Sequence, residues 1–533
     1  MPVTTIPLVG QMTARGFAKT IGTSSKDQQY INCLFEVAVN PALGKKALYV
    51  VKRPGSTTSS SIGATCYAVA SYSSYFTNMS CTSTALFRGS TNIGTISSIV
   101  NDLSVADTVM NATEVICFNT TGSAVYFVFK DAVTTNFPTF SGDTHTNTTI
   151  DNIASTTGLY PGQLITGTGI QAGTRILTIT SATAITTTIA TTGTATITIT
   201  KEAVALVLDA DSPAAAGVVA SVSALNGYMF TGTTDGRIFN CPVNSPWLQT
   251  AADYISADFG ADNLQALYKW GNYIIAGGAA SLQYFQITGN ASGSILSAAQ
   301  ALNKQTDIPS TLKPRWVGGS GYLISGATDA GYSIYKMSSP TDMATVTDPV
   351  TGAIISGNIT SGGLGTVTIT GDKKLVMACN GNGTSSVVYD DTTRMASIYK
   401  MDANILSSFG TTFTKSGATT LFTWAAGDTW TDSSAAYTMT IQTEPLVLNN
   451  GRYFVIDRVE LIADTQSSGT TALTTYDDDY TTALTHEAFD MTAVNKEVTR
   501  LGGFDNHVIF KLEHSANTGF RAQALKIHWR PGY

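Results

Sequence analysis

NLQALYKWGNYIIAGGAASLQYFQI, from Asn263 to Ile287, is the stretch that decides the fold class of this 533-residue chain. Its three apolar runs are separated by Gly271-Asn272 and by Gly277-Gly278. Short runs rich in aromatic and β-branched residues are typical of strands, and glycine or asparagine between them favours tight hairpin turns. The stretch therefore predicts three consecutive antiparallel strands.

The same pattern recurs on both sides of this stretch. It occurs upstream in GYMFTGTTDGRIFNC (227–241) and downstream in WVGGSGYLISGATDAGYSIYKM (316–337). A spacing of about 45 to 50 residues, once an insertion of about 65 residues is removed, predicts a β-propeller with six or seven blades. One or two β-sandwiches with ordinary turn spacing are the alternative. Comparable strands lie near Tyr67, Ile116, Tyr228, Tyr273, Tyr322, Leu375 and Leu421.

The insertion covers residues 141–200 and is rich in threonine. Near its end, TATITIT (194–200) alternates threonine with apolar residues, which is the pattern of a half-exposed strand. We expect a small inserted β domain that projects outward from the propeller. A long decorated hairpin of the propeller itself is the alternative.

Around this insertion we expect four further segments. Residues 1–60 form an N-terminal arm or platform segment, and the propeller takes residues 61–140 and 201–445. After residue 446 the strands become longer, as in GRYFVIDRVELIAD (451–464) and HVIFKLEHS (507–515). Their alternation predicts a separate β-sandwich-like unit, a C-terminal β platform over residues 446–533. The alternative is that these strands complete the platform.

Composition and charge exclude several classes of protein. Only 13% of the residues are charged, and 30 basic residues face 37 acidic ones, for a net charge of -7. Tight sequence-independent DNA binding needs many Lys and Arg side chains on phosphates, so this balance argues against it. No apolar run approaches the ~20 residues of a membrane helix. The first residues, MPVTTIPLVGQM, lack the basic head and apolar block of a signal peptide, so we expect none.

Motifs that would carry chemistry are missing from the sequence. There is no P-loop, no zincin helix motif and no nucleophile elbow. The six cysteines form no CxxC pair, so we expect free, buried thiols. Asp477 to Asp479 predicts a solvated acidic loop, not a cation site. We expect strand-edge positions and no metal site for His486, His507, His514 and His528.

We therefore expect no enzyme, no cofactor and no metal. A glycan hydrolase, the enzyme alternative, would need paired carboxylates, and we find no spacing that identifies them.

Two stretches resemble a known family. Lys26 to Gly55 is similar to the N-terminal segment of the tail nozzle or hub proteins of short-tailed bacteriophages, also called packaged-DNA stabilisation proteins. Asp235 to Gly293 resembles a short blade of the same family, with Leu282 in place of the usual isoleucine, and Arg500 to Ser515 is a weaker echo. The matching positions are Asp27, Gln28, Asn32, Glu36, Gly44-Lys45, Tyr49 and Lys52 to Gly55 in the first stretch, and Ser281, Phe285 and Gly289-Asn290 in the second. The inserted domain resembles a Thr/Gly-rich β module of phage structural and bacterial surface proteins, and the family does not require it.

The resemblance implies a structural virion protein located in the tail and made in the host cytoplasm. It implies a homo-hexameric ring below the adaptor (the head-to-tail connector) and the portal, which retains packaged DNA and conducts it during ejection. Tail fibres or spikes are further expected partners, and no membrane insertion is expected. Double-stranded DNA would pass without tight binding, because a lumen poor in Lys and Arg repels phosphate. A receptor-binding or glycan-binding propeller of the tail is the alternative function.

Lys52, Arg53, Pro54 and Gly55 are the candidate site. We expect them to form an exposed type II turn, in which Pro54 restricts φ and Gly55 takes the positive-φ position. They would contact the adaptor or a neighbouring subunit, and a solvated turn without partners is equally compatible with the sequence.

Overall fold

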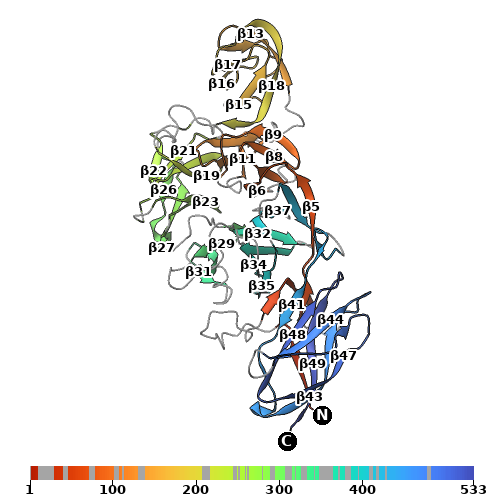
Figure 1. Ribbon diagram of the computed structural model, residues 1–533. Helices are drawn as coiled ribbons and strands as arrows, with labels where there is room; N and C mark the ends of the chain where they lie inside the picture. Colours follow the sequence, from red (N-terminus) through yellow and green to blue (C-terminus); the bar gives the residue numbers. More distant parts are fainter. Residues whose placement is uncertain are drawn as a thin grey trace.

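A computed structural model describes most of the chain. The described residues are 2–9, 29–39, 46–70, 78–100, 107–110, 113–129, 139–161, 163–206, 217–243, 249, 252–258, 260, 263–278, 280–288, 294–305, 315–317, 320–325, 333–340, 342–346, 364–369, 373–378, 386–393, 395–401, 403–406, 412–415, 419–425, 429–476 and 482–532. Strands dominate them, and they form three parts: a propeller, a module above it and a sandwich below it (Figure 1).

The propeller contains seven blades among the described residues, each with four or five antiparallel strands, and the sheets of blades two, six and seven continue beyond the blade. Blade one consists of β6 (Ala68–Ala70), β7 (Met79–Cys81), β8 (Ala85–Arg88) and β9 (Thr91–Thr95). Blade two consists of β10 (Asp107–Met110), β11 (Thr113–Asn119), β12 (Val125–Phe129) and the end of β18 (Thr194–Leu206). Blade three consists of β19 (Val219–Leu225), β20 (Tyr228–Thr233), β21 (Arg237–Asn240) and β22 (Tyr254–Ser256).

Blades four to seven follow in chain order. Blade four consists of β23 (Ala266–Trp270), β24 (Tyr273–Gly277), β25 (Ser281–Ile287), β26 (Leu296–Ala298) and β27 (Lys304–Gln305), and blade five of β28 (Arg315–Val317), β29 (Ser320–Ser325), β30 (Ser333–Ser339) and β31 (Asp342–Thr345). Blade six consists of β32 (Leu364–Ile369), β33 (Lys373–Ala378), β34 (Ser386–Asp390) and β35 (Met395–Tyr399). Blade seven consists of β36 (Ala403–Leu406), β37 (Thr412–Lys415), β38 (Thr420–Trp424) and β5 (Ser56–Ser61).

This arrangement confirms the predicted propeller. Each position marked by the repeat falls in a different blade: Tyr67 lies directly before β6, and the other six lie inside a strand. Adjacent blades bury each other's faces, so that Phe230 of blade three and Ile274 of blade four share one core, and Tyr284 of blade four and Met337 of blade five share another. A single sheet leaves its apolar faces exposed, and stacking blades in a ring removes them from water.

An N-terminal strand closes the ring. β5 pairs antiparallel with β38, from Ser56 opposite Trp424 to Ser61 opposite Thr420. Blade seven in turn contacts blade one, through β36 and β37 against β6. The last blade is thus completed by residues from the start of the chain.

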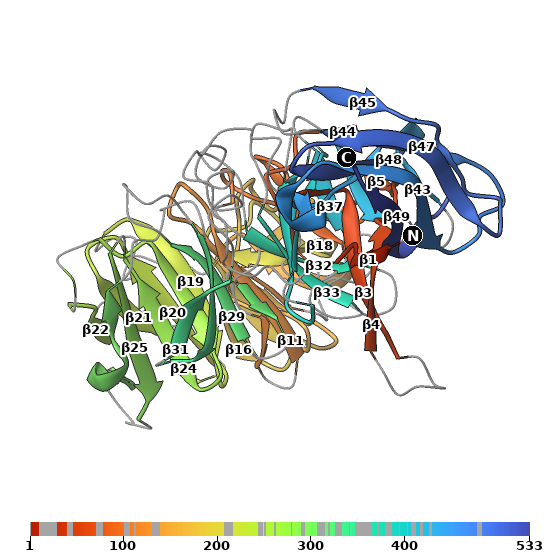
Figure 2. The same cartoon turned by 90° about the horizontal axis from the view of Figure 1, so that it is seen from below.

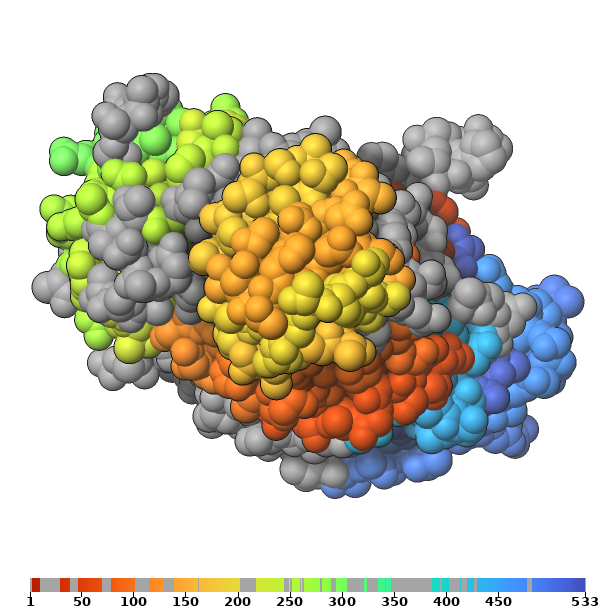
Figure 3. Space-filling view, turned by 90° about the horizontal axis from the view of Figure 1, so that it is seen from above, coloured from red at the N-terminus to blue at the C-terminus, as the bar shows by residue number. Residues whose placement is uncertain are grey.

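The inserted module stands above the propeller (Figures 1 and 3). Its strands are β13 (Thr139–His145), β14 (Thr149–Asp151), β15 (Gln163–Gly167), β16 (Ile176–Ser181), β17 (Ala184–Thr187) and the first part of β18. It has its own core of Ile150, Ile153, Leu159, Ile165, Ile176, Ile185 and Ile199. The long strand β18 pairs with β13 in the module and then with β12 of blade two, so one strand belongs to both parts.

The sandwich is built from both ends of the chain and lies to one side of the propeller seen from below (Figure 2). Its first sheet contains β1 (Val3–Pro7), β3 (Cys33–Val39), β4 (Lys46–Lys52), β43 (Phe454–Ala463), β47 (Lys496–Phe504) and β49 (Arg521–Pro531). Its second sheet contains β41 (Met439–Gln442), β42 (Leu446–Val447), β44 (Thr470–Tyr476), β45 (Ala483–Thr485), β46 (Phe489–Asp490) and β48 (His507–His514). Phe35, Ile456 and Phe510 share the core between the sheets.

The described N-terminal strands therefore do not form a separate arm. β1 and β4 pair with β49, and β5 belongs to the propeller. The pairing partners lie at opposite ends of the chain, so no local pattern in the sequence reports this arrangement. The fold class retains its predicted parts, but the sandwich is completed by N-terminal strands.

Candidate functional site

The candidate residues Lys52 to Gly55 lie where the chain leaves β4 of the sandwich and enters β5 of the propeller. All four are buried, with Lys52 1% and Arg53 0% exposed. The expectation of an exposed turn is not met, and the side chains of Lys52 and Arg53 act inside the chain. We call Asn32, Arg53, Lys400, Asp432 and Tyr437 the joint, because they connect the sandwich to the propeller.

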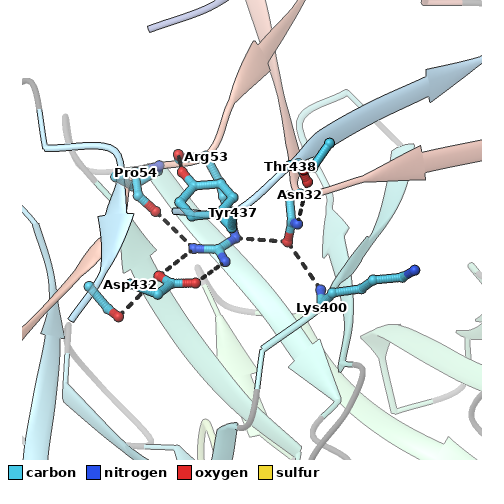
Figure 4. A network of polar contacts seen from close by, with 8 residues as sticks. Asn32, Arg53, Pro54, Lys400, Asp432, Tyr437 and Thr438 are labelled. Atoms are coloured by element: carbon cyan, nitrogen blue, oxygen red, sulfur yellow. Dashed lines mark hydrogen bonds and ion pairs between the residues drawn. The ribbon is translucent and has the colours of Figure 1, made fainter. Parts of the chain in front are cut away.

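Arg53 makes polar contacts in three directions within the joint (Figure 4). Its two terminal nitrogens bind both carboxylate oxygens of Asp432, with Nη1 3.0 Å from Oδ1 and Nη2 paired with Oδ2. Nε donates to Asn32 Oδ1 at 3.0 Å, and Nη1 also donates to the carbonyl oxygen of Pro54 at 3.1 Å. Burial by itself lowers the pKa of Arg53, but the hydrogen bonds and charge of Asp432 outweigh it and raise that pKa. The guanidinium is therefore a permanent, fully paired buried cation.

Aromatic rings enclose the same guanidinium. Its central carbon lies 3.9 Å from the ring centre of Tyr437, 5.3 Å from that of Tyr399 and 5.8 Å from that of Trp424. The Tyr437 hydroxyl also donates to the carbonyl oxygen of Arg53. Cation–π contacts of this kind contribute most where water is excluded, so the rings stabilise the charge as well as fill the space.

The side chain of Asn32 connects three segments of the chain, and its backbone adopts an uncommon conformation. Oδ1 accepts from Arg53 Nε and from the backbone amide of Lys400, both at 3.0 Å, and Nδ2 donates to the carbonyl oxygen of Thr438 at 2.7 Å. Its φ of 56° lies in the left-handed region, which asparagine tolerates better than most residues. An aspartate at position 32 could not donate to Thr438, so the amide is the group that this geometry requires.

Lys52 and His514 lie on the sandwich side of the joint. Lys52 Nζ donates to the carbonyl oxygen of Ala516 at 2.7 Å and lies 4.6 Å from the ring centre of Tyr437. Burial, aided by the charge of Arg53, lowers the pKa of Lys52 to about 8. Burial and the charge of Lys52 lower the pKa of His514 to about 4. His514 is therefore neutral at pH 7, and its ring nitrogens contact hydroxyls of Thr471 and Thr518.

Gly55 is required for a different reason from the one predicted. Its φ is not positive, so the expected type II turn is wrong. A Cβ at this position would overlap the carbonyl oxygen of Thr431 and lie 2.7 Å from the amide nitrogen of Thr431. Glycine is needed because two backbone segments approach closely.

The other residues singled out in the sequence do not converge. His486 contacts Thr475, and His528 contacts Glu460 and Arg458, at separate places in the sandwich. No group of three His, Cys, Asp or Glu side chains in the described part of the chain could hold a metal ion. Five described cysteines are free and buried, as predicted: Cys33, Cys66, Cys81, Cys117 and Cys241. Cys379 and Asp477 to Asp479 lie outside the described residues.

The second family-like stretch is structural where it is described. Ser281, Leu282 and Phe285 belong to β25 and are all buried. Gly289-Asn290 lies outside the described residues. The described residues of this second motif are therefore buried parts of a strand in blade four.

Two partners in the joint were missed in the sequence. Asp432 and Tyr437 lie 379 and 384 residues from Arg53 along the chain. A buried arginine requires a carboxylate, but nothing local in the sequence says which of the 37 acidic residues supplies it. Burial of Arg53 itself had no signal either, since Lys-Arg-Pro-Gly is also the composition of a surface turn.

Comparisons with known proteins place the chain in no family. No family model and no curated protein matches. Similar solved structures include virginiamycin B lyase from Staphylococcus aureus, at 7% identity, with 70% of this chain and 98% of that chain covered and a TM-score of 0.36. The computationally designed Ika8 protein matches at 8% identity, over 69% and 99% of the two chains, with a TM-score of 0.34. The WD40 domain of Neurospora crassa Pan2 matches at 7% identity, over 75% and 90%, with a TM-score of 0.30. TM-scores this low support no conclusion about the function of this chain.

The described helices are two short 3-10 turns, η2 (Gln300–Leu302) and η3 (Asn449–Gly451). Among the described residues, no helix has the length and apolar character needed to cross a membrane.

Proposed function

We propose that this chain is a structural tail protein of a short-tailed bacteriophage, the nozzle or hub ring below the adaptor and portal. In this role it retains packaged DNA and forms the channel for genome ejection. The observation that carries the proposal is the family-like segment from Lys26 to Gly55, of which Asn32 and Arg53 are bonded to each other in the joint. A motif whose residues hold two β domains together is expected in a family defined by architecture and not by catalysis.

The charge of the chain supports the same role. A nozzle must let a duplex slide, and rings of Lys or Arg would hold its phosphates. With a net charge of -7 and only 13% charged residues, the chain has few cations to place on a lumen. In this proposal the protein acts without catalysis, cofactor or metal.

The proposed partners are five further copies of the chain, the adaptor, tail fibres or spikes, and DNA that passes without tight binding. The proposed location is the virion tail, after synthesis in the host cytoplasm. The Arg53 side chain is enclosed within the chain, so other surfaces than Lys52 and Arg53 would supply the adaptor contact.

Electron microscopy of tails from particles that contain this chain tests the proposal. We expect a ring of six copies below the adaptor, with density for seven-bladed propellers. A monomeric, trimeric or twelvefold arrangement, or absence of the chain from the tail, would contradict the proposal. Assembled tails are the appropriate sample, because recombinant subunits lack the adaptor on which such a ring would form.

A further inference from the structure

Three segments join the sandwich to the propeller: one strand that pairs with both parts, and two stretches of chain that pass from one part to the other. The strand β2 (Gln29–Ile31) pairs antiparallel with β41 of the sandwich and parallel with β35 of blade six. Residues 53–55 connect β4 directly to β5. The other passage leads from β38 through β39 (Thr431–Asp432) and β40 (Ala435–Ala436) to β41. The ladder of blade six therefore continues into the second sheet of the sandwich.

Asp432 binds both sides of this boundary at once. One of its carboxylate oxygens accepts from Arg53 Nη1 and from Ser56 Oγ, each at 3.0 Å. Ser56 is the first residue of β5, the strand that closes the propeller, and it pairs with Trp424 and with Asp432 itself. Arg53 in turn bonds Asn32, the residue between β2 and β3 of the sandwich. A single ion pair thus holds the start of the closing strand and the edge of the sandwich.

We propose that Arg53, Asp432 and Ser56 form a clasp that couples closure of the propeller ring to assembly of the sandwich, so that neither part opens without the other. This inference is independent of the proposed function. β5 closes blade seven only while β4 is held in the sandwich, because three residues separate the two strands. The sandwich keeps β4 in place only while residues 53–56 are anchored in the propeller.

Breaking the clasp leaves a buried charge without its partner. Removing one member of a buried ion pair leaves the other buried and unpaired, which costs several kcal/mol. Arg53 has an exposed side-chain fraction of 0% and Asp432 of 15%, so water cannot take the place of Asp432 around the enclosed guanidinium. Loss of Arg53 therefore weakens the interactions on the β5 side and the Asn32 side together.

Hydrogen–deuterium exchange on the full-length chain tests the clasp, with Arg53→Met compared with wild type. We expect exchange to become faster on the order of a hundredfold in β5 and β38 of blade seven and, by a similar factor, in β4 and β49 of the sandwich. The inserted module should keep its wild-type rates, since its core is separate. Faster exchange in only one of the two regions, or unchanged exchange in both, would overturn the proposal.

Two further variants make the test independent of whether Arg53→Met folds well. Tyr437→Phe removes one hydroxyl, the donor to the Arg53 carbonyl oxygen, and should accelerate the same two regions in parallel by a smaller factor. Arg237→Met is the matched control, because Arg237 pairs with Asp235 at an exposed hairpin of blade three. It should alter exchange around β20, β21 and β22 alone, since Arg237 also lies over the ring of Tyr254 in β22. If Arg237→Met made hydrogen–deuterium exchange faster in both blade seven and the sandwich, the cause would be a general loss of stability, and this result would contradict a specific clasp.

Discussion

Arg53 shows how far the surroundings of a residue change its role. Lys-Arg-Pro-Gly has the composition of an exposed turn, yet Arg53 is fully buried against Asp432 and three aromatic rings. Gly55 follows the same principle, since its lack of a side chain is needed for close approach to Thr431 and not for a positive φ. Residue type limits what each position can do, and the neighbours decide which of those options is used.

His514, on the sandwich side of the joint, gives the stability of the chain a predictable response to pH. Its pKa falls from 6.5 to about 4 on folding, so the unfolded chain binds more protons than the folded chain between these values. The stabilising contribution is therefore complete above pH 6.5 and is lost as the pH falls toward 4. Since one pKa unit corresponds to about 1.4 kcal/mol, the loss should be on the order of 3 kcal/mol.

Urea unfolding at pH 7.5, 5.5 and 4 measures this effect. The His514→Gln variant should have a flatter dependence of unfolding free energy on pH than wild type, whatever its absolute stability. His486→Gln is the comparison at a less buried ring in the same sandwich. Burial lowers the pKa of His486 as well, so this variant should flatten the dependence less than His514→Gln does. Equal slopes for wild type and His514→Gln would show that another group causes the acid sensitivity.

At the scale of elements, β18 decides where the inserted module ends. Its first part pairs with β13 in the module, and Val204 to Leu206 pair with β12 as the fourth strand of blade two. Threonine alternation revealed the first part of this strand in the sequence. The change of partner along one strand has no periodic signature, because side chains of a strand alternate between the two faces of the sheet whichever strand it pairs with.

A deletion series tests the independence of the module. Replacing residues 141–199 by a short Gly/Ser linker should leave a soluble protein with a cooperative melt, because the module has a separate core. Extending the deletion through Leu206 should destabilise the propeller, because blade two then loses its fourth strand. Circular dichroism melts of both variants provide the comparison. An insoluble first variant, or equal stability of the two, would place the boundary elsewhere.

At the scale of the whole molecule, the low content of basic residues predicts weak contact with DNA. In the proposed ring, a neutral to acidic channel would hold DNA by a constriction of loops and not by bonds to phosphates. Assembled rings should bind duplex DNA weakly at physiological salt and with a shallow dependence on salt, because few counterions are released. Fluorescence anisotropy over a salt series measures both quantities. Sub-micromolar affinity, or Lys and Arg rings on the lumen, would contradict this prediction.

The sequence alone determined the fold class, a repeat of six or seven units and the presence of the inserted domain, and the structure decided that the blades are seven among the described residues. These features depend on local patterns: alternating apolar residues, turn residues and a repeat of about 45 to 50 positions. Only the tertiary structure decided that β1, β3 and β4 belong to the sandwich, that β5 closes the propeller and that Arg53 pairs with Asp432. Those pairings join residues far apart along the chain, for example Glu36 and Arg521 at a separation of 485. Contacts of this kind are selected by the packing of whole sheets, so no short stretch of sequence contains them.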